Sequence, residues 1–350
     1  TSCWPGSIWR SATWSARSDE ARTGTSTSDV TFAELPNDEQ VARLARLAAR
    51  ALSAWDISAP QLELVKYREN AVFVVTARER GRSILRIHRP RYRSDDDIRS
   101  ELAWMHALDA DGIPTPSAIS TRNGDYVTTV AVEGVPEPRQ CDLMTWVPGQ
   151  PPGTLEAGVA AGADEVHTLY RAVGSLAARM HEHVAGWQKP PWFVRPAWNV
   201  ETLVGEHPTF GPFWELAAVS DEQMSILLAA RDRVRERLRR FRPANVLIHG
   251  DLVPDNILVD GATTRVIDFD DFGWSWIGFE MTTSLFPLQV SGSFDAGLAG
   301  YLEGYRAVRP FPADELALLP EMLMARGLSY LGWPVGRPEI ESARNLIPML

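Results

Sequence analysis

The sequence predicts an α+β protein in which a small antiparallel sheet carrying one helix is followed by a larger, mostly helical part. Two observations support this fold class. Short runs of apolar and β-branched residues, bounded by polar turns, occupy the first part, whereas long segments with apolar residues at helical spacing dominate the second. A third observation places the boundary, because the proline- and glycine-rich residues 147–153 interrupt regular structure.

The composition is that of a globular protein with room for about two domains. The chain has 350 residues, of which 45% are hydrophobic and 23% are charged, close to the averages for soluble domains. Lys and Arg number 35 against 45 for Asp and Glu, which gives a formal net charge of −10. This balance argues against a general affinity for nucleic acid or for an anionic membrane.

Cysteine usage and hydropathy predict the cellular compartment in which the protein resides. The two cysteines, Cys3 and Cys141, form neither a disulfide framework nor a C-x-x-C metal motif, as is typical of a reducing environment. No uninterrupted apolar run approaches the roughly 18 residues of a membrane span. We therefore expect a cytoplasmic protein with no membrane partner, and the composition leaves its oligomeric state open.

The first part of the chain divides into a tail and an N-terminal lobe. Residues 1–33 are rich in Ser, Thr, Arg and Gly without an apolar period, which predicts a disordered tail. Residues 34–147 are expected to form the lobe, beginning with a helix near Asn37 whose apolar face includes Val41 and Leu44. Strands are predicted at 71–77, 83–88, 126–132 and 141–147, with a helix at 97–108.

Residues 148–350 are expected to form a second, mainly helical lobe. Apolar residues recur there at helical spacing, as Val173, Leu176 and Met180 do within one such segment. Helices are predicted at 163–183, 221–242, 295–306 and 313–331.

The most informative segment is residues 249–271, HGDLVPDNILVDGATTRVIDFDD. It holds six aspartates against the single Arg265, and its apolar runs at 257–259 and 266–267 predict a hairpin around Asp260 and Gly261. Such crowding of like charge is costly unless water, hydrogen bonds or cations intervene. Carboxylate and amide oxygens suit Mg²⁺, which completes its shell with water and phosphate. The hairpin is therefore expected to hold a metal nucleotide.

The spacing within this segment indicates phosphoryl transfer. Asn256 follows Asp251 by five residues, and Asp268 follows Asn256 by twelve. This arrangement matches the kinase catalytic set. In that set Asp251 would accept the proton of the substrate hydroxyl, while Asn256 and Asp268 would hold the Mg²⁺ that bridges the phosphates of ATP.

These residues resemble the H-G-D-x-x-x-x-N…I-D-F-D-D pattern of the aminoglycoside phosphotransferase and choline kinase superfamily, which has the bilobal protein-kinase-like fold. The sequence is most similar to the homoserine-kinase-like and stress-response Ser/Thr-kinase-like bacterial branch. The resemblance extends over about residues 34–350 and implies a nucleotide-binding first lobe and a catalytic, substrate-binding second lobe. Further similar stretches lie at residues 67–70, 85–94, 100–104, 211–214 and 330–333.

The resemblance implies roles for further residues. Arg86 stands where the family usually has a phosphate-contacting Lys, and Glu101 on the following helix would be its ion-pair partner. Asp270 is expected to bind the metal or to orient its loop. His249 would fix the catalytic loop, and Glu280 stands where relatives carry an Asp that braces this loop.

The resemblance also places the base and phosphates of the nucleotide. Met144 would stand behind the adenine, Thr145 would offer a carbonyl, and Val147 would offer an N–H. No G-x-G-x-x-G loop precedes residues 71–75. The phosphates would therefore depend on Arg86, on Mg²⁺ and on backbone N–H groups of the turn at residues 69–70.

The predicted function is an ATP-dependent phosphotransferase with Mg²⁺ as cofactor. Its acceptor would be a hydroxyl of a small molecule such as an amino alcohol, a hydroxy amino acid, a sugar or an aminoglycoside. Two alternatives stay open at this point, namely a protein serine/threonine kinase of the stress-response type and a non-catalytic, kinase-like nucleotide-binding module. The choice between ATP and GTP also stays open.

Overall fold

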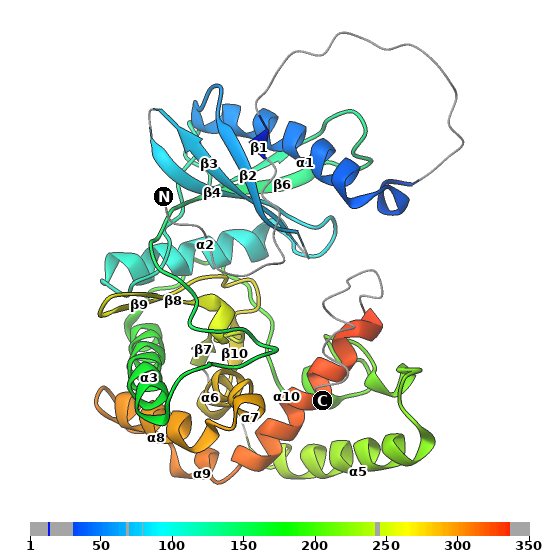
Figure 1. Cartoon of the computed structure of the whole chain (residues 1–350), viewed down its shortest axis with the longest axis vertical. Helices are drawn as coiled ribbons and strands as arrows, with labels where there is room; N and C mark the ends of the chain where they lie inside the picture. Colours follow the sequence, from blue (N-terminus) through cyan, green and yellow to red (C-terminus); the bar gives the residue numbers. More distant parts are fainter. Residues whose placement is uncertain (1–12, 15–30, 68–69, 79, 242–245, 337–350) are drawn as a thin grey trace. The chain divides into compact units, whose positions relative to one another are not determined.

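The computed structural model describes residues 13–14, 31–67, 70–78, 80–241 and 246–336 (Figure 1). The chain divides into two compact units. Unit 1 comprises Thr1–His106 and Pro116–Trp146, and unit 2 comprises Ala107–Thr115 and Val147–Leu350. Except at 13–14 and 31–33, the predicted tail lies outside the described residues, as do Cys3 and Glu69.

Unit 1 is built on a mixed-length antiparallel sheet with the strand order β1-β2-β3-β4-β6-β5. The predicted strands at 71–77, 83–88, 126–132 and 141–147 correspond to β3, β4, β5 and β6. Two further strands, β1 and β2, were not predicted. β1 lies in the segment predicted to be a disordered tail, so the prediction is wrong at these two residues, which pair with β2. In β2 the polar Glu63 and Lys66 obscure the apolar alternation, and only Leu62 is buried. The strands are β1 (Thr13–Trp14), β2 (Gln61–Tyr67), β3 (Ala71–Ala77), β4 (Gly81–Ile87), β5 (Val127–Val130) and β6 (Arg139–Thr145).

Two helices accompany this sheet. Helix α1 (Asn37–Ala51) starts where the sequence predicts and buries the expected apolar face, including Val41 and Leu44. Helix α2 (Asp95–Ala110) carries Glu101 on its buried side. The core between α1 and the sheet contains Trp55, whose indole N–H donates to the carbonyl of Ile119 at 2.7 Å. Short 3₁₀ helices lie at Phe32–Glu34 and Leu52–Trp55.

Unit 2 is mostly helical, as predicted. In the described part of the chain, no helix combines the length and apolar character needed to cross a bilayer. Its helices are α3 (Ala163–Gly186), α4 (Val200–Val204), α5 (Asp221–Leu238), α6 (Ile277–Leu285), α7 (Leu288–Ser291), α8 (Phe294–Arg306), α9 (Ala313–Leu316) and α10 (Leu319–Gly336), with 3₁₀ helices at Phe213–Glu215 and Pro254–Asn256.

Two helix predictions need correction. The single helix predicted at 313–331 is interrupted, because α9 ends at Leu316 and α10 begins at Leu319. Pro320 explains the break, since a proline ring clashes with the carbonyl four residues earlier and tolerates only the first turn of a helix. Helix α6 was not predicted, because all nine of its residues are buried and it therefore lacks an amphipathic period.

Two short ribbons complete unit 2. Strands β8 (Ile257–Asp260) and β9 (Thr263–Val266) form the hairpin predicted around Asp260 and Gly261. Gly261 has a φ of 57°, a left-handed conformation that suits glycine in a tight turn. Strands β7 (Val246–Ile248) and β10 (Gly273–Ser275) pair antiparallel. The segment between β7 and β8 is thereby brought beside the segment between β9 and β10.

Helices α3 and α8 pack side by side with their backbones in close contact (Figure 1). Their contact depends on three glycines, Gly174 on α3 and Gly300 and Gly304 on α8. A Cβ atom at any of them would fall inside the van der Waals radius of a backbone carbonyl oxygen of the facing helix. The backbones therefore approach as closely as glycine allows, and this contact fixes α3 within unit 2.

Gly304→Ala should destabilise unit 2, because the added methyl group would overlap the carbonyl of Arg171 and force α3 and α8 apart. Overpacking of this kind costs about 1–3 kcal/mol or more, measurable as a lower urea midpoint of unfolding. Gly186→Ala is the matched control, since nothing lies near a Cβ at that helix end, and alanine there should be neutral or stabilise by up to about 1 kcal/mol. Equal midpoints for the two variants would contradict this account of the helix contact.

Candidate active site

The two ribbons bring together the loops that carry the predicted catalytic residues. One loop runs from His249 to Asn256 and the other from Ile267 to Phe272, and the Ile267 N–H donates to the Asn256 carbonyl at 2.9 Å. Gly250 has a φ of 78°, and a Cβ there would lie 2.5 Å from the carbonyl oxygen of Asp271. The backbones of the two loops are therefore in direct contact.

Asp251 and Asn256 are joined by hydrogen bonds that settle the orientation of the amide. The Asn256 Nδ2 group donates to the Asp251 carbonyl at 2.9 Å and to its carboxylate Oδ2 at 2.8 Å. An amide group that faces two acceptors must present its NH₂ to them. The Oδ1 atom of Asn256 is thereby directed elsewhere and becomes available as an oxygen ligand.

His249 joins the two loops as a neutral side chain. Burial lowers the pKa of its imidazole to about 4, although the Asp268 carboxylate opposes this shift. The Nε2–H therefore donates to the Ile267 carbonyl at 3.0 Å, and Nδ1 accepts from the Asp251 N–H at 3.3 Å. The ring also packs edge-on against Phe269. This geometry is that of a clamp between the loops and not of a proton shuttle.

Glu280 supports the same loop from α6. Its carboxylate accepts the backbone N–H groups of His249 at 2.7 Å and Gly250 at 2.9 Å. Burial raises the pKa of Glu280 to about 7, and the two N–H groups offset only part of the increase. His181 lies 3.9 Å from the carboxylate, and burial lowers the pKa of that imidazole to about 3. The carboxylate thus has backbone dipoles as partners and no cationic histidine.

The second loop holds Asp268 in an unusual backbone conformation. Its φ of 65° lies in the left-handed region, which non-glycine residues occupy at a cost of about 1–3 kcal/mol and mainly at functional sites. Neighbouring side chains fix the loop around it. Arg195 donates to the carbonyls of Asp270 and Phe272, and the indole of Trp198 donates to the carbonyl of Asp271 at 2.7 Å.

Arg326 on α10 is a partner of Asp251 that the sequence did not reveal. One guanidinium nitrogen, Nη2, lies 2.9 Å from the Asp251 Oδ1 atom and 2.8 Å from the Tyr330 hydroxyl. The Arg326 side chain is 2% exposed, whereas that of Asp251 is 30% exposed. Both carboxylate oxygens of Asp251 therefore have a protein partner, and the group remains open to solvent on one side.

In unit 1, Arg86 forms the predicted ion pair with Glu101 at 2.6 Å. It also pairs with Asp142, to which Nε and Nη2 both donate, and Asp142 in turn lies 2.6 Å from His88. Burial acts to raise the pKa of Asp142, but the charge of Arg86 and the contact with His88 outweigh it and lower this pKa to about 2. Arg86 is thus held between two carboxylates, only one of which was expected.

The predicted adenine-contacting residues lie at the end of β6 and just beyond it. Met144 is buried in the sheet between β4 and Ala118. The Thr145 N–H donates to the Ser117 carbonyl at 2.9 Å, and its hydroxyl accepts from the Ser117 N–H. Val147 follows as the first residue of the main part of unit 2. Their contacts with a nucleotide stay a prediction.

The site fits a metal that is held jointly by protein and phosphate. Among the described residues, no group of three or more His, Cys, Asp and Glu side chains could hold a metal ion. Magnesium requires fewer protein ligands, because water and substrate phosphates complete its shell. The orientation of the Asn256 amide, with its oxygen turned away from Asp251, fits a ligand role for that oxygen.

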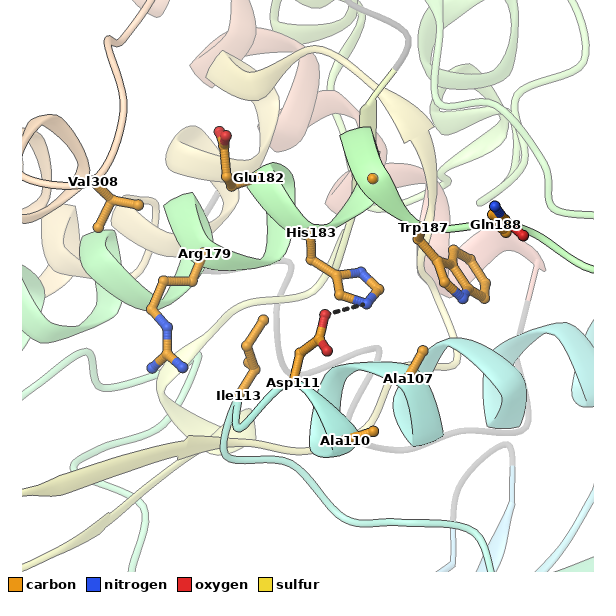
Figure 2. Close-up of a pocket in the computed structure, with 11 residues that line it drawn as sticks. Ala107, Ala110, Asp111, Ile113, Arg179, Glu182, His183, Trp187, Gln188 and Val308 are labelled. Carbon is orange, nitrogen blue, oxygen red and sulfur yellow. Dashed lines mark ion pairs between the residues drawn. The ribbon is translucent and has the colours of Figure 1, made fainter.

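A separate cavity of about 580 Å³ opens within unit 2, between residues 107–113 of that unit and the C-terminal turns of α3 (Figure 2). Inside it His183 Nε2 lies 3.4 Å from Asp111, the contact marked by the dashed line in Figure 2. Arg179 closes one side by donating to the carbonyl of Gly112 at 2.8 Å. None of the predicted site residues lines this cavity, so we assign no step of the chemistry to it.

The comparison with known families establishes the class of this protein. Residues 61–311 match the family described as "Phosphotransferase enzyme family". The match covers well over half of the chain, so the chain belongs to the phosphotransferase enzyme family. The resemblance inferred from the H-G-D-x-x-x-x-N segment is confirmed, and the protein is a phosphotransferase.

Individual relatives agree with this class. A homoserine kinase from Azorhizobium caulinodans is 28% identical over 242 residues, covering 67% of this chain and 68% of that protein. A microcompartment-associated aminopropanol kinase is similar in structure, with a TM-score of 0.72, 29% identity and coverage of 86% of this chain and 92% of the other. Amicoumacin kinase hAmiN, solved with AMP-PNP, Ca²⁺ and Ami, has a TM-score of 0.67 at 19% identity, covering 90% and 92%. The last similarity supports the fold alone, and the predicted fold class is confirmed.

The Glu280 carboxyl should make stability depend on pH. Its pKa is raised from 4.5 to about 7, so between these values the native protein holds a proton that the unfolded chain has released. The contribution of Glu280 to the free energy of unfolding therefore falls as the pH rises through this window, by about 3 kcal/mol in total. Urea titrations between pH 5 and 8 should show this slope in the wild type relative to Glu280→Gln.

The exposed Glu222 in the first turn of α5 offers the control, since Glu222→Gln should leave the slope of the wild type in place. Parallel pH profiles for the wild type and Glu280→Gln would show that Glu280 does not titrate in this range in the native protein.

Proposed function

We propose that this protein is an ATP-dependent phosphotransferase that transfers the γ-phosphate to a hydroxyl group of a small molecule. The observation that carries the proposal is the pairing of Asp251 with Asn256, in which the amide donates to the carboxylate at 2.8 Å. One loop thereby presents a proton acceptor together with an amide oxygen that is turned away from it, and the adjacent loop carries Asp268. These are the groups that phosphoryl transfer to an alcohol requires.

In the proposed reaction, Asp251 receives a hydrogen bond from the acceptor hydroxyl and orients its oxygen toward the γ-phosphorus. As the new bond between this oxygen and phosphorus forms, the bond from phosphorus to the β,γ-bridging oxygen breaks and ADP departs with that oxygen. The hydroxyl proton passes to the Asp251 carboxylate late in the transfer. The side chains of His249 and Glu280 hold the backbone of the loop in place throughout the reaction, because both side chains form hydrogen bonds with main-chain groups of the two loops.

The metal in this proposal is Mg²⁺, held by the Asn256 amide oxygen and the Asp268 carboxylate, with Asp270 as a further candidate ligand. When bound, it neutralises charge that develops on the phosphate oxygens. Amicoumacin kinase hAmiN, a protein of this fold, was solved with AMP-PNP and Ca²⁺, so the fold is compatible with a bound nucleotide and a divalent metal. The hydrogen bonds from Arg195 and Trp198 to the loop of Asp268, and those of the Asn256 amide, hold the two loops in position before any ligand arrives.

The proposed nucleotide-binding residues of unit 1 are Arg86, Glu101, Met144 and Thr145, with Val147 at the start of the second unit. Arg86 is 4% exposed and already pairs with two carboxylates. Its proposed contribution is therefore a fixed positive charge and a rigid attachment of α2 to β4, and not that of a mobile side chain that reaches out to phosphate. The backbone N–H groups predicted near residues 69–70 lie partly outside the described residues, and their contact with phosphate stays a prediction.

The proposed acceptor is a small amino alcohol or hydroxy amino acid. The relatives named homoserine kinase and aminopropanol kinase support this class, since each name denotes a molecule that carries both an amine and a hydroxyl group. A protein hydroxyl group is the alternative acceptor. After Asp271 the chain enters β10 and α6 within a few residues, so it has no long activation segment of the kind that regulated protein kinases use.

A nucleotide-consumption screen tests the proposal. Purified protein with ATP and Mg²⁺ should consume ATP in the presence of at least one amino alcohol, hydroxy amino acid, sugar or aminoglycoside, and leave protein acceptors unphosphorylated. Phosphorylation of protein acceptors alone would favour the protein-kinase alternative. Nucleotide binding without transfer to any acceptor would favour a non-catalytic module.

Asp251→Asn should lower kcat by about 10²–10⁴-fold, because the amide cannot accept the hydroxyl proton. The same substitution at the hairpin tip, Asp260→Asn, should leave kcat unchanged, since Asp260 is exposed and pairs only with Arg265 among the contacts seen. Initial rates at saturating ATP and acceptor measure both. A variant at position 251 that retained most of its turnover would overturn the role assigned to Asp251.

Asp268→Ala should lose the magnesium-dependent part of nucleotide binding, because it removes a carboxylate ligand while Asn256 remains. Calorimetric titration with ATP, with and without Mg²⁺, should show a large gain in affinity from Mg²⁺ for the wild type and for Asp260→Ala. For Asp268→Ala this gain should largely disappear. Unchanged, magnesium-dependent binding by Asp268→Ala is incompatible with the metal role of this residue.

A further inference from the structure

Arg326 lies outside the sequence motif that predicts the chemistry, yet it contacts Asp251, the proposed base within that motif. It comes from α10, and its Nη2 atom lies 2.9 Å from the Asp251 Oδ1 atom. The catalytic loop itself supplies no positive charge, because Leu252, Val253 and Pro254 are apolar and His249 is neutral at physiological pH. The cation nearest to the proposed base therefore comes from another part of unit 2.

The guanidinium of Arg326 is surrounded mainly by aromatic rings, which attract a cation through their faces but accept few hydrogen bonds. It lies 4.2 Å from the ring centroid of Tyr330, with Phe210 and Phe279 at 5.8 and 5.9 Å. Among the described residues, its Nε atom has no hydrogen-bond partner. A buried donor without a partner costs about 1–3 kcal/mol, and apolar replacements of buried ion pairs are often neutral or stabilising. Stability of the fold alone therefore does not explain an arginine at this position.

The geometry of the Asp251 carboxylate gives a better explanation. Arg326 holds Oδ1, and the Asn256 amide holds Oδ2 at 2.8 Å. Two donors on different oxygens fix both the position and the rotation of a carboxylate plane, which either donor alone would leave free to turn. The exposed side of the carboxylate then faces a direction set by the protein, as productive orientation of an acceptor hydroxyl requires.

We propose that Arg326 is a positioning residue for phosphoryl transfer, which orients the Asp251 carboxylate toward the acceptor hydroxyl. This inference rests on the proposed function. It adds a requirement that the family motif does not contain, because the catalytic aspartate needs a donor from α10 as well as the asparagine of its own loop. Arg326 acts through Asp251 and does not itself contact the reacting atoms.

The test is a double-mutant cycle of Arg326→Met with Asp251→Asn. Arg326→Met alone should lower kcat by about 10–100-fold, in line with the cost of misplacing a reacting group, while the KM values for ATP and acceptor change by less than about threefold. In the Asp251→Asn background the same substitution should change kcat by less than about threefold, because the carboxylate it positions is gone. Additive losses would overturn the proposal, and so would an unchanged kcat in the single variant.

Arg231→Met is the matched control. Arg231 is a second buried arginine of unit 2, which donates to the carbonyls of Val204 and Gly205 and lies over the ring of Trp214. Its replacement should lower the urea midpoint and leave kcat unchanged. If Arg326→Met does not fold, Arg326→Lys carries the same cycle, since an ammonium retains the charge but not the planar geometry. If the wild-type protein transfers phosphate to no acceptor, the proposed function is wrong. If the wild type is active and the losses in the cycle are additive, only the role assigned to Arg326 is wrong.

Discussion

The hydrogen bonds from the His249 and Gly250 N–H groups to the buried Glu280 carboxylate are the interaction on which the rest of the candidate site depends. These two peptide groups come directly before Asp251, so their attachment to α6 determines where the Asp251 side chain starts. His249 then carries the constraint to the second loop through its bond to the Ile267 carbonyl. The burial that raises the pKa of Glu280 is the electrostatic cost of placing this acceptor inside the helical unit.

Buried guanidinium groups have different consequences in the two units. Arg86 is enclosed by Asp142 and Glu101, both of which are fully buried, so its contacts are saturated and hold β4, β6 and α2 together. Arg326 is equally buried, but its partner Asp251 is partly exposed. The partly exposed carboxylate of Asp251 can therefore contact a ligand while it is paired with the buried cation. The first arrangement therefore holds a positive charge in a fixed position, and the second is suited to orienting a group that reacts.

The sequence predicted those structural features that are determined by residues close together along the chain. The β8–β9 hairpin followed from two apolar runs and an Asp-Gly turn, and α3 followed from its helical period. Features without a local signal were missed, such as α6, which is buried on all sides. The same limit applies to the site. The spacing of Asp251, Asn256 and Asp268 lies within one segment, but Asp142 is 56 residues from Arg86, and Arg326 is 75 residues from Asp251, so only the fold reveals these pairs.

A weaker signal for the missed partners was nevertheless present. Arg326 is the one charged residue between Glu321 and the end of α10 and stands among mostly apolar residues. The arginines of α5, by contrast, lie in a segment that also contains Asp232 and Glu236. A charge that must be buried needs a partner, because desolvation is costly unless it is compensated. Such a residue therefore indicates that a partner exists but does not identify it. The packing of α10 against α4, α5 and α6 determines which residue becomes the partner. In the proposed reaction the family motif provides the reacting groups, and the long-range packing of unit 2 places the charge of Arg326 beside Asp251.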